Sequence, residues 1–286
     1  FYIISAGIII IGFAVTFVRG MNYGIDFTGG TMIQVDLHEQ VAISEVEEAV
    51  KEYDLNPSII YSGEGNEQVV IKTIEALDTD QRAEVIKTLE ENFGITDEDV
   101  LASEQFGPSV GDELKLNAVK AVAIASVGML IYIIFRFKSW KYGLSAIAGV
   151  VHDVLLVIAF YGIFGFTVNN PFIAAILTLV GYSINDTIVI FDRIRENTGI
   201  YRKAGLEANI DNSINSTLNR TIMTSLTTLV VMIPLCIMVS SSIREFIIPL
   251  MVGIIVGCYS SIFVCSPLYY DLCKSGCLLY TSDAAD

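Results

Sequence analysis

The feature that most constrains this fold is a set of apolar segments, each long enough to cross a lipid bilayer. A bilayer core about 30 Å thick requires roughly 20 apolar residues in an α-helix. Hydrophobic residues make up 53% of the chain, enough for several such helices. The expected spans are residues 1–18, 117–135, 142–166, 172–191, 221–239 and 246–268. We therefore predict a multi-pass, α-helical membrane protein with six spans.

Acidic residues are concentrated between the first two spans, in residues 19–116, which we call the insert domain. Positions 20–115 hold 22 acidic and 5 basic residues, so this segment accounts for the net charge of −15 of the chain. Because phosphate groups bind basic surfaces, nucleic-acid binding is disfavoured. The acidic side chains lack the spacing of a calcium-binding loop, and we interpret them as solvated surface. The spacing of the cysteines predicts neither a metal site nor a disulfide framework.

The insert domain has the alternating pattern of a ferredoxin-like βαββαβ fold, an α+β class. We expect capping by Ser44 with Glu47 in the first helix and by Thr79 in the second. The expected order is strand 31–37, helix 44–54, strand 58–62, strand 68–73, helix 79–93 and strand 100–106.

A glycine-rich turn precedes the first strand of the insert domain. It contains Gly24, Asp26, Gly29 and Gly30. The turn lacks both the lysine and the spacing of a phosphate-binding loop. We therefore interpret its glycines as tight-turn residues at the entry to the strand.

The distribution of Lys and Arg predicts how the chain is oriented in the membrane. Loops 136–141 and 192–220 hold most of the basic residues outside the insert domain, and such loops are cytoplasmic. Both termini are then cytoplasmic, and the insert domain is extracytoplasmic. In 192–220 the apolar positions predict an amphipathic surface helix. We also expect a short lead before Phe1, and a non-native tail at 277–286.

One acidic residue, Asp186, falls inside the fourth span. It lies roughly 9 Å from the charged edge at Asp192, at 1.5 Å per helical residue. A carboxylate at this depth costs several kcal/mol unless it is paired or protonated, so such a residue indicates a functional site. Ser183 and Asn185 give the same turn of the helix a polar character.

Other polar residues inside the spans could form a site with this acid. Asp153 lies near the middle of the third span, and Arg220 opens the fifth span, followed on its face by Thr224 and Thr227. We predict a proton relay in which a carboxyl alternates between a charged, paired state and a protonated state. We interpret His152 as a helix contact, outside the relay.

A static interpretation of the same residues stays open. In it, Asp186 and Arg220 form a permanent ion pair near the cytoplasmic interface, and the arginine is an anchor of the positive-inside kind. Gly253 and Gly257 in the sixth span predict close helix packing under either interpretation.

Four motifs resemble those of the SecF family, which are accessory proteins of the Sec translocon. Residues 24–30 look like the signature after that family's first span, and residues 180–197 resemble its fourth-span signature nearly throughout. Residues 219–221 resemble the start of its fifth span, and the pair His152-Asp153 resembles its third-span pair. The resemblance extends over about residues 1–274.

The resemblance implies an RND-like half-transporter in the bacterial cytoplasmic membrane, which is not an enzyme and which pairs obligately with SecD. Such assemblies use the proton gradient, without another cofactor, to help pull SecA-driven preproteins out of the SecYEG channel, and YajC is a further implied partner. By motif position, Asp186 and Arg220 match residues of proton passage, while the family's other key acid lies in SecD. Whether the chain is a stand-alone subunit or half of a fused SecDF stays open.

Two other functions are compatible with part of the pattern. An RND-like exporter of small molecules or lipids usually carries two large external domains and twelve helices in one chain, whereas this chain has one insert. An intramembrane aspartyl protease would use Asp153 and Asp186 on successive spans. Its motifs resemble Tyr-Asp and Gly-x-Gly-Asp, whereas the residues preceding these acids are His and Asn.

Overall fold

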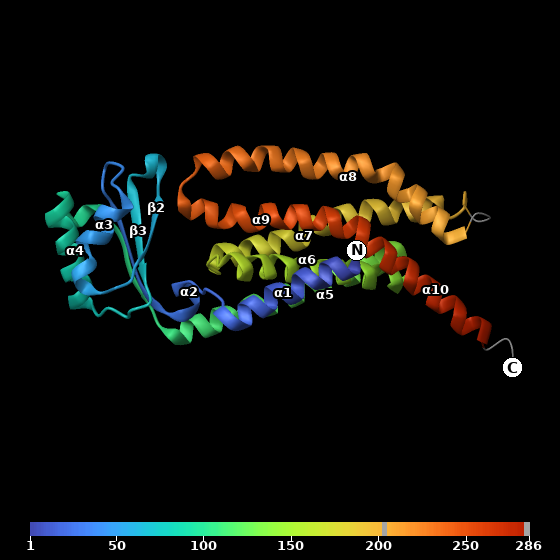
Figure 1. Ribbon diagram of the computed structural model, residues 1–286, viewed down its shortest axis with the longest axis horizontal. Helices are drawn as coiled ribbons and strands as arrows, with labels where there is room; N and C mark the ends of the chain where they lie inside the picture. Colours follow the sequence, from blue (N-terminus) through green and yellow to red (C-terminus); the bar gives the residue numbers. More distant parts are fainter. Residues whose placement is uncertain (202–204, 283–286) are drawn as a thin grey trace.

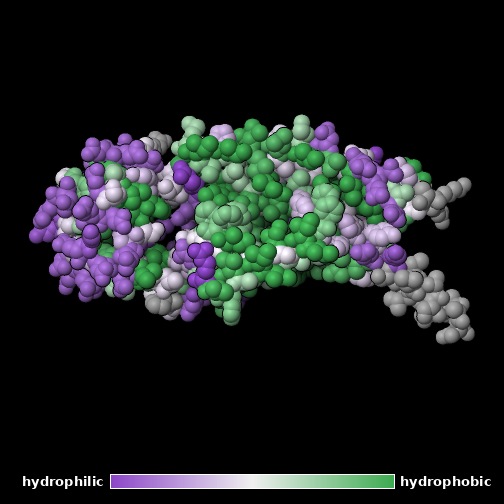
Figure 2. All heavy atoms as spheres, in the orientation of Figure 1, coloured by the Kyte–Doolittle hydropathy of each residue, from purple (hydrophilic) through white to green (hydrophobic). Residues whose placement is uncertain are grey.

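The computed structural model describes residues 1–201 and 205–282, which form a bundle of long helices with a small α+β domain at one end (Figure 1). Six helices of the described chain are long and apolar enough to cross a membrane. Figure 2 shows apolar side chains around the bundle, with hydrophilic side chains gathered on the insert domain and near the opposite end. The predicted class, six spans with one α+β insert, is confirmed.

Three of the membrane helices form the centre of the bundle, and three lie at its periphery. In α6, α7 and the last span, which begins with α9, half of the residues in the most apolar 18-residue stretch are buried. Far fewer are buried in the corresponding stretches of α1, α5 and α8. The helices are α1 (Tyr2–Arg19), α5 (Pro108–Phe137), α6 (Trp140–Phe164), α7 (Asn170–Asn197), α8 (Gly205–Met238), α9 (Ser241–Ser260) and α10 (Ser266–Ser282). A π-helical turn (Ser261–Cys265) joins α9 to α10.

Small residues allow the central helices to approach closely. Gly253 of α9 lies against Leu179 of α7, and one turn later a Cβ added to Gly257 would lie 3.1 Å from the Cβ of Ser183. Gly149 of α6 lies in the same way against the Cys265 side chain. In lipid, where apolar surface gives little drive to associate, such small residues let helices gain packing contacts.

The insert domain contains a four-stranded antiparallel sheet within the described residues, in the order β2-β3-β1-β4. The strands are β1 (Gly30–Asp36), β2 (Ser58–Ser62), β3 (Gln68–Thr73) and β4 (Val100–Phe106). Helices α3 (Ile43–Ala49) and α4 (Thr79–Phe93) cover the face of the sheet that is turned away from the bundle (Figure 1). Alternate strand residues and one face of each helix form its apolar core, which includes Ile33, Val35, Val46, Val69, Ile71, Val85 and Leu89.

The predicted helix caps are wrong. Helix α3 begins one residue before Ser44, which therefore lies inside the helix and does not cap it. Helix α4 is capped by Asp78: its carboxylate accepts from the Gln81 N–H at 2.9 Å, and the Gln81 side chain accepts from the Asp78 N–H at 3.0 Å. Thr79 lacks such a partner because the residue three positions later is Arg82, which cannot accept a hydrogen bond.

The predicted surface helix in residues 192–220 is also wrong as a separate element. Helix α7 continues to Asn197, and α8 runs from Gly205 through the fifth span. The reason is packing between the two extensions: the Asn197 amide donates to Ser213 at 2.9 Å, and the Asn209 amide donates to the Ile194 carbonyl at 3.0 Å. Positions 202–204, with two of the predicted cytoplasmic cations, lie outside the described residues.

Other predicted bounds differ at their ends. Helix α5 begins at Pro108, nine residues before the predicted span, because its first turns pack on the short helix α2 (Ile25–Thr28). The sixth span begins at Ser241 and is interrupted by the π-helical turn. The predicted tail at 277–286 overlaps the end of α10, and residues 283–286 lie outside the described part.

Candidate functional site

Asp153 lies at the point where α6, α7 and α9 meet, with a fully buried side chain. One oxygen, Oδ2, accepts hydrogen bonds from Ser183 of α7 at 2.5 Å and Ser260 of α9 at 2.8 Å. The other oxygen, Oδ1, lies 2.9 Å from Nδ1 of His152. Three helices therefore supply partners to one carboxyl group, which offsets much of the cost of burying it.

A second set of hydroxyl groups continues this polar region along the bundle. The Thr187 and Ser261 hydroxyls are 2.8 Å apart, and the Thr187 hydroxyl donates to the Cys265 sulfur at 3.7 Å. Ser261 and Cys265 are the first and last residues of the π-helical turn. The wider turn brings both side chains toward α7, and such turns are frequent at functional sites.

Asp186 has much poorer hydrogen bonding, although its side chain is also buried. In the described chain its one hydrogen bond comes from the Ser225 hydroxyl of α8, at 3.4 Å. This distance is beyond the usual range for such bonds between oxygens. A buried carboxyl with one weak partner is a group whose charge the surrounding protein does not fix.

Arg220 lies on α8, the same helix as Ser225, but its side chain is exposed. Among residues 1–201 and 205–282, no ion pair joins it to Asp186. Five residues along a helix correspond to a rotation of about 140°, so Arg220 and Ser225 point to different faces. The permanent ion pair of the static interpretation is not formed in this conformation.

The remaining polar residues named from the sequence differ in their position. Ser183 is in the site, as a donor to Asp153. Asn185 is exposed on the outer face of α7. The Thr224 hydroxyl donates to the Arg220 carbonyl and the Thr227 hydroxyl to the Thr224 carbonyl, so both bond to the backbone of their own helix.

Several hydroxyl groups of the site do not stand out in the sequence. These are Thr187, Ser225, Ser260 and Ser261. The available signal was weak: hydroxyl side chains inside apolar spans often bond across helices, but their spacing does not say to what.

The two acids do not share a site. Asp153 and Asp186 have no common hydrogen-bond partner in the described residues. An aspartyl protease requires two carboxyl groups that share a proton at close range. The geometry therefore gives no support to the protease hypothesis.

The glycine-rich turn forms the joint between the insert domain and the bundle. Its residues fold into helix α2, where the Asp26 carboxylate accepts from the N–H of Asn170 at 3.0 Å. The Gly24 N–H donates to the carbonyl of Val168 at 2.8 Å. Gly30 has a φ of +142° and would place a Cβ against the Thr73 carbonyl, so this position requires glycine.

Glu245, at the start of α9, connects the same joint to the sheet. Its Oε2 accepts from the Asn169 amide at 2.6 Å and lies 3.6 Å from the Lys72 ammonium of β3. The side-chain oxygen of Asn169 in turn accepts from the Phe172 N–H at 3.0 Å and caps α7. Lys72, Asn169 and Glu245 line a cavity of about 200 Å³ between the insert domain and the bundle. The insert domain is therefore bonded directly to the first turns of α7 and α9.

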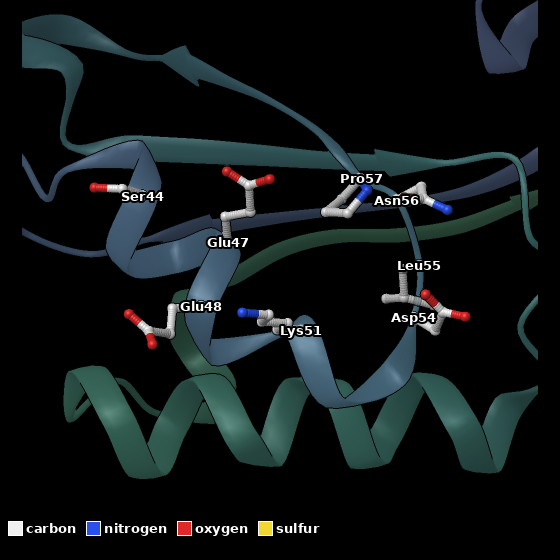
Figure 3. A pocket seen from close by; sticks show the side chains of 8 residues that line it. All are labelled: Ser44, Glu47, Glu48, Lys51, Asp54, Leu55, Asn56 and Pro57. Carbon is white, nitrogen blue, oxygen red and sulfur yellow. The ribbon is translucent and has the colours of Figure 1, made fainter.

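A second pocket, of about 430 Å³, lies on the insert domain beside α3 (Figure 3). The carboxyl groups of Glu47, Glu48 and Asp54 point in different directions there. Among the residues that the structure describes, no group of three or more His, Cys, Asp or Glu side chains could hold a metal ion. This pocket has the features of ordinary solvated surface.

Comparison with known proteins assigns the family. The family described as Protein export membrane protein SecD/SecF, C-terminal, matches residues 85–275, and the SecD/SecF GG motif matches residues 14–41. This chain belongs to the SecD/SecF family. The family predicted from the sequence is thus confirmed, and the GG motif includes the glycine-rich turn.

Relatives agree with this assignment over nearly the whole chain. Protein translocase subunit SecF of Sebaldella termitidis is 40% identical, over 94% of this chain and 88% of its own length. Protein translocase subunit SecDF of Thermus thermophilus is 38% identical over 93% of this chain, which spans 37% of that protein. The crystal structure of SecDF from Thermus thermophilus has a TM-score of 0.79 at 37% identity, and it covers 94% of this chain. With its six apolar helices, the chain is a multi-pass protein of the inner membrane.

Proposed function

We propose that this chain is an accessory subunit of the Sec preprotein translocase, which acts with a SecD-type partner and uses the proton gradient to promote export. Its similarity to translocase subunits supports the role in export. The observation that carries the proton coupling is Asp186, a buried carboxyl inside a membrane helix with a single weak hydrogen bond among the described residues. Intramembrane acids of this kind commonly carry protons in transporters.

Helix α7 is the element through which a proton would change the structure. It carries Asp186 toward α8, and it carries Ser183 toward Asp153 on α6. When Asp186 is protonated, apolar surroundings suit it. When it is charged, it needs a cation or water, and Arg220 is available on α8 after a movement of that helix. The proposed relay therefore comprises Asp186, Arg220 and Asp153, and its energy source is the proton gradient alone.

A partner is proposed because a polar face of α7 is left exposed. Thr178, Gly181 and Asn185 form this face on successive turns of the helix. An amide exposed at membrane depth is costly in lipid, so another protein surface should cover it. SecD is the proposed occupant, because relatives exist in which the matching region is part of a SecDF chain. SecYEG, YajC and SecA-driven preproteins are proposed as further partners on the family resemblance alone.

The proposed orientation places the insert domain outside the cell and both termini inside. Arg136 and Arg195 contact Asp192 at 2.9 and 3.1 Å, near the C-terminal ends of α5 and α7. These helix ends lie at the end of the bundle opposite to the insert domain (Figure 1). Basic loops are retained on the cytoplasmic side. Labelling of a single cysteine introduced into the insert domain, in intact cells, tests this orientation; protection from an impermeant reagent would overturn it.

The function is tested by reconstitution of the full chain with a SecD-type subunit, SecYEG and SecA in vesicles. We expect an imposed proton gradient to raise the amount of preprotein exported, and we expect Asp186→Asn to remove this increase. If the gradient instead drove efflux of a dye or lipid and left preprotein export unchanged, the RND-like exporter would be the better assignment.

A further inference from the structure

Among the largely buried titratable groups that the proposed relay leaves unused is the imidazole of His152. Its side chain on α6 is 10% exposed, and its Nδ1 lies 2.9 Å from Oδ1 of Asp153. Its other nitrogen, Nε2, is buried and has no hydrogen-bond partner in the described part of the chain. A buried nitrogen without a partner is costly, and such groups often have a functional reason.

We propose that His152 and Asp153 form a second proton-binding site of the bundle, in which the proton is held at Nε2 of His152. This proposal deepens the proposed function and rests on it. An ionised carboxylate only accepts hydrogen bonds, so the neutral ring carries its proton on Nδ1 and has a lone pair on Nε2. A proton from water then adds to this lone pair, and the new N–H bond completes an imidazolium next to the carboxylate. The pair changes from a net charge of −1 to zero.

The surroundings of Asp153 fix the carboxylate in place for this role. Ser183 and Ser260 both donate to Oδ2, which leaves Oδ1 directed to the imidazole. No lysine or arginine bonds to Asp153 in the described ranges. The other titratable groups that face the pair are the Tyr259 hydroxyl of α9 and the Cys265 thiol of the π-helical turn. His152 is therefore the side chain that can supply the positive charge.

The site lies on the opposite side of the central helices from Asp186. The His152 ring lies against the Tyr259 ring, with centroids 6.1 Å apart, and the Tyr259 hydroxyl is 3.0 Å from the Ser5 hydroxyl of α1. Asp186 instead faces α8, and Figure 1 shows α1 and α8 on opposite sides of α7 and α9. The two proposed proton sites can thus be reached from opposite flanks of the bundle.

The sequence makes a direct test possible, because the chain contains two histidines, His38 and His152. His38 lies on the surface of the insert domain with a side chain that is 66% exposed. The full-length variant His38→Gln, labelled with ¹⁵N-histidine and placed in lipid vesicles, gives nitrogen signals from one ring. We expect a neutral ring with its proton on Nδ1 at pH 9 and a doubly protonated ring at pH 5. A ring that stays neutral throughout this range, or that is neutral with its proton on Nε2, would overturn the proposal.

Two further substitutions in this background separate the pair from its surroundings. Asp153→Asn removes the adjacent negative charge, so the proton affinity of the ring should fall about tenfold or more. Tyr259→Phe keeps the ring contact and removes only a hydroxyl, so the titration should not change. An unchanged titration in Asp153→Asn would mean that the two side chains do not act as a pair.

A functional measurement connects the titration to export. His152→Asn keeps a donor near the position of Nδ1 but cannot take up a proton, and we expect it to lower gradient-driven export at least about tenfold. This threshold lies below the effect of about 100-fold or more that is typical of a side chain that itself transfers the proton. Normal export by this variant would remove the site from the relay. The spectroscopic titration does not depend on export, so a titrating ring with no gradient effect in the parent protein would refute the proposed function and leave the proton site intact.

Discussion

Asp153 and Asp186 are both buried carboxyl groups between membrane helices, but their surroundings differ. Asp153 has partners from α6, α7 and α9, at 2.5 to 2.9 Å. Asp186 has one described partner, at 3.4 Å. The comparison teaches that depth in the membrane does not by itself identify the group that changes state. A carboxylate held by three partners is fixed in place, whereas one held by a single weak partner can be protonated or paired again at little cost.

The largest effect is expected from Asp186→Asn, which replaces the weakly hydrogen-bonded carboxyl group of the two. Asparagine keeps the shape of the side chain but cannot titrate, so we expect gradient-driven export to fall about 100-fold while folding is retained. Export from vesicles under an imposed gradient measures this effect. Asp186→Glu is the matched control and should retain part of the activity, because glutamate still titrates. Normal export by Asp186→Asn would reduce Asp186 to a structural residue.

The next largest effect is expected from Arg220→Lys. Lysine keeps the charge but lacks the planar group that can bind a carboxylate through two nitrogens, so partial loss of export is expected, about tenfold. Because Arg220 is exposed and unpaired with Asp186 in the described chain, the melting temperature should not change. A large drop in melting temperature, with export per folded molecule unchanged, would support the static interpretation.

A third prediction tests the hydrogen bonds of Asp153, the strongly bonded carboxyl group. Ser260→Ala removes a donor from the buried Asp153 carboxylate and should destabilise the protein by about 1–3 kcal/mol. Ser225→Ala removes the long bond to Asp186 and should cost well under about 1 kcal/mol. Thermal unfolding in detergent measures both. Equal losses in the two variants would mean that the two acids depend on their partners to the same extent.

Close packing at the Asp153 site gives a fourth prediction. Gly257→Ala places a methyl group 3.1 Å from the Cβ of Ser183 and should destabilise the chain by roughly 1–3 kcal/mol, because Ser183 must shift from its carboxylate. Gly181→Ala on α7 is the control, since no described atom outside its own helix lies within 4 Å of that Cβ. That variant should be neutral or stabilising by up to about 1 kcal/mol in the chain alone, through helix propensity. The melting temperatures of the two variants test this order.

The smallest effect is expected at Asp99, a partly exposed carboxyl group of the insert domain, which serves as a reference for the two buried in the membrane bundle. The Thr96 backbone N–H, and then its hydroxyl, donate to Asp99 and lower the pKa of that carboxyl below its usual value. A lowered pKa stabilises the folded state above the unfolded value of about 3.9, and this contribution is lost as the pH falls below it. Asp99→Asn should therefore lower the free energy of unfolding slightly at pH 7 and weaken its pH dependence below about pH 4. If the pH dependence of unfolding below about pH 4 were unchanged in this variant, the lowered pKa of Asp99 would be contradicted.

Part of this architecture could be predicted from the sequence because it depends on length and period. Apolar runs identify membrane helices, alternation identifies the strands of the sheet, and a charge inside an apolar run identifies Asp186. The extension of α8 was missed because its apolar positions face the end of α7, and a surface helix would show the same pattern. Helix boundaries depend on such neighbours.

The partners in the site could not be predicted, for a reason of geometry. Ser260 and Ser225 are single hydroxyl groups in apolar spans, and their bonds depend on how the helices rotate against each other. Arg220 was grouped with Asp186 because its motif opens the next helix. Its position on α8 is about 140° around the helix from Ser225, and the described residues show no ion pair between it and Asp186.

The contact between Glu245, Asn169 and Lys72 connects the insert domain directly to two membrane helices, α7 and α9. Asn169 caps α7 through its oxygen and holds Glu245 through its nitrogen, and Glu245 holds the sheet through Lys72. A force on the sheet is thus transmitted to the N-terminal end of α7. Asp186 lies about 24 Å along α7 from that end, so a tilt of the helix by about 5° moves the Asp186 carboxyl by about 2 Å. Such a displacement exceeds the margin of the one hydrogen bond described for Asp186. Under the proposed function, a pull on the insert domain would therefore change the surroundings in which Asp186 takes up its proton.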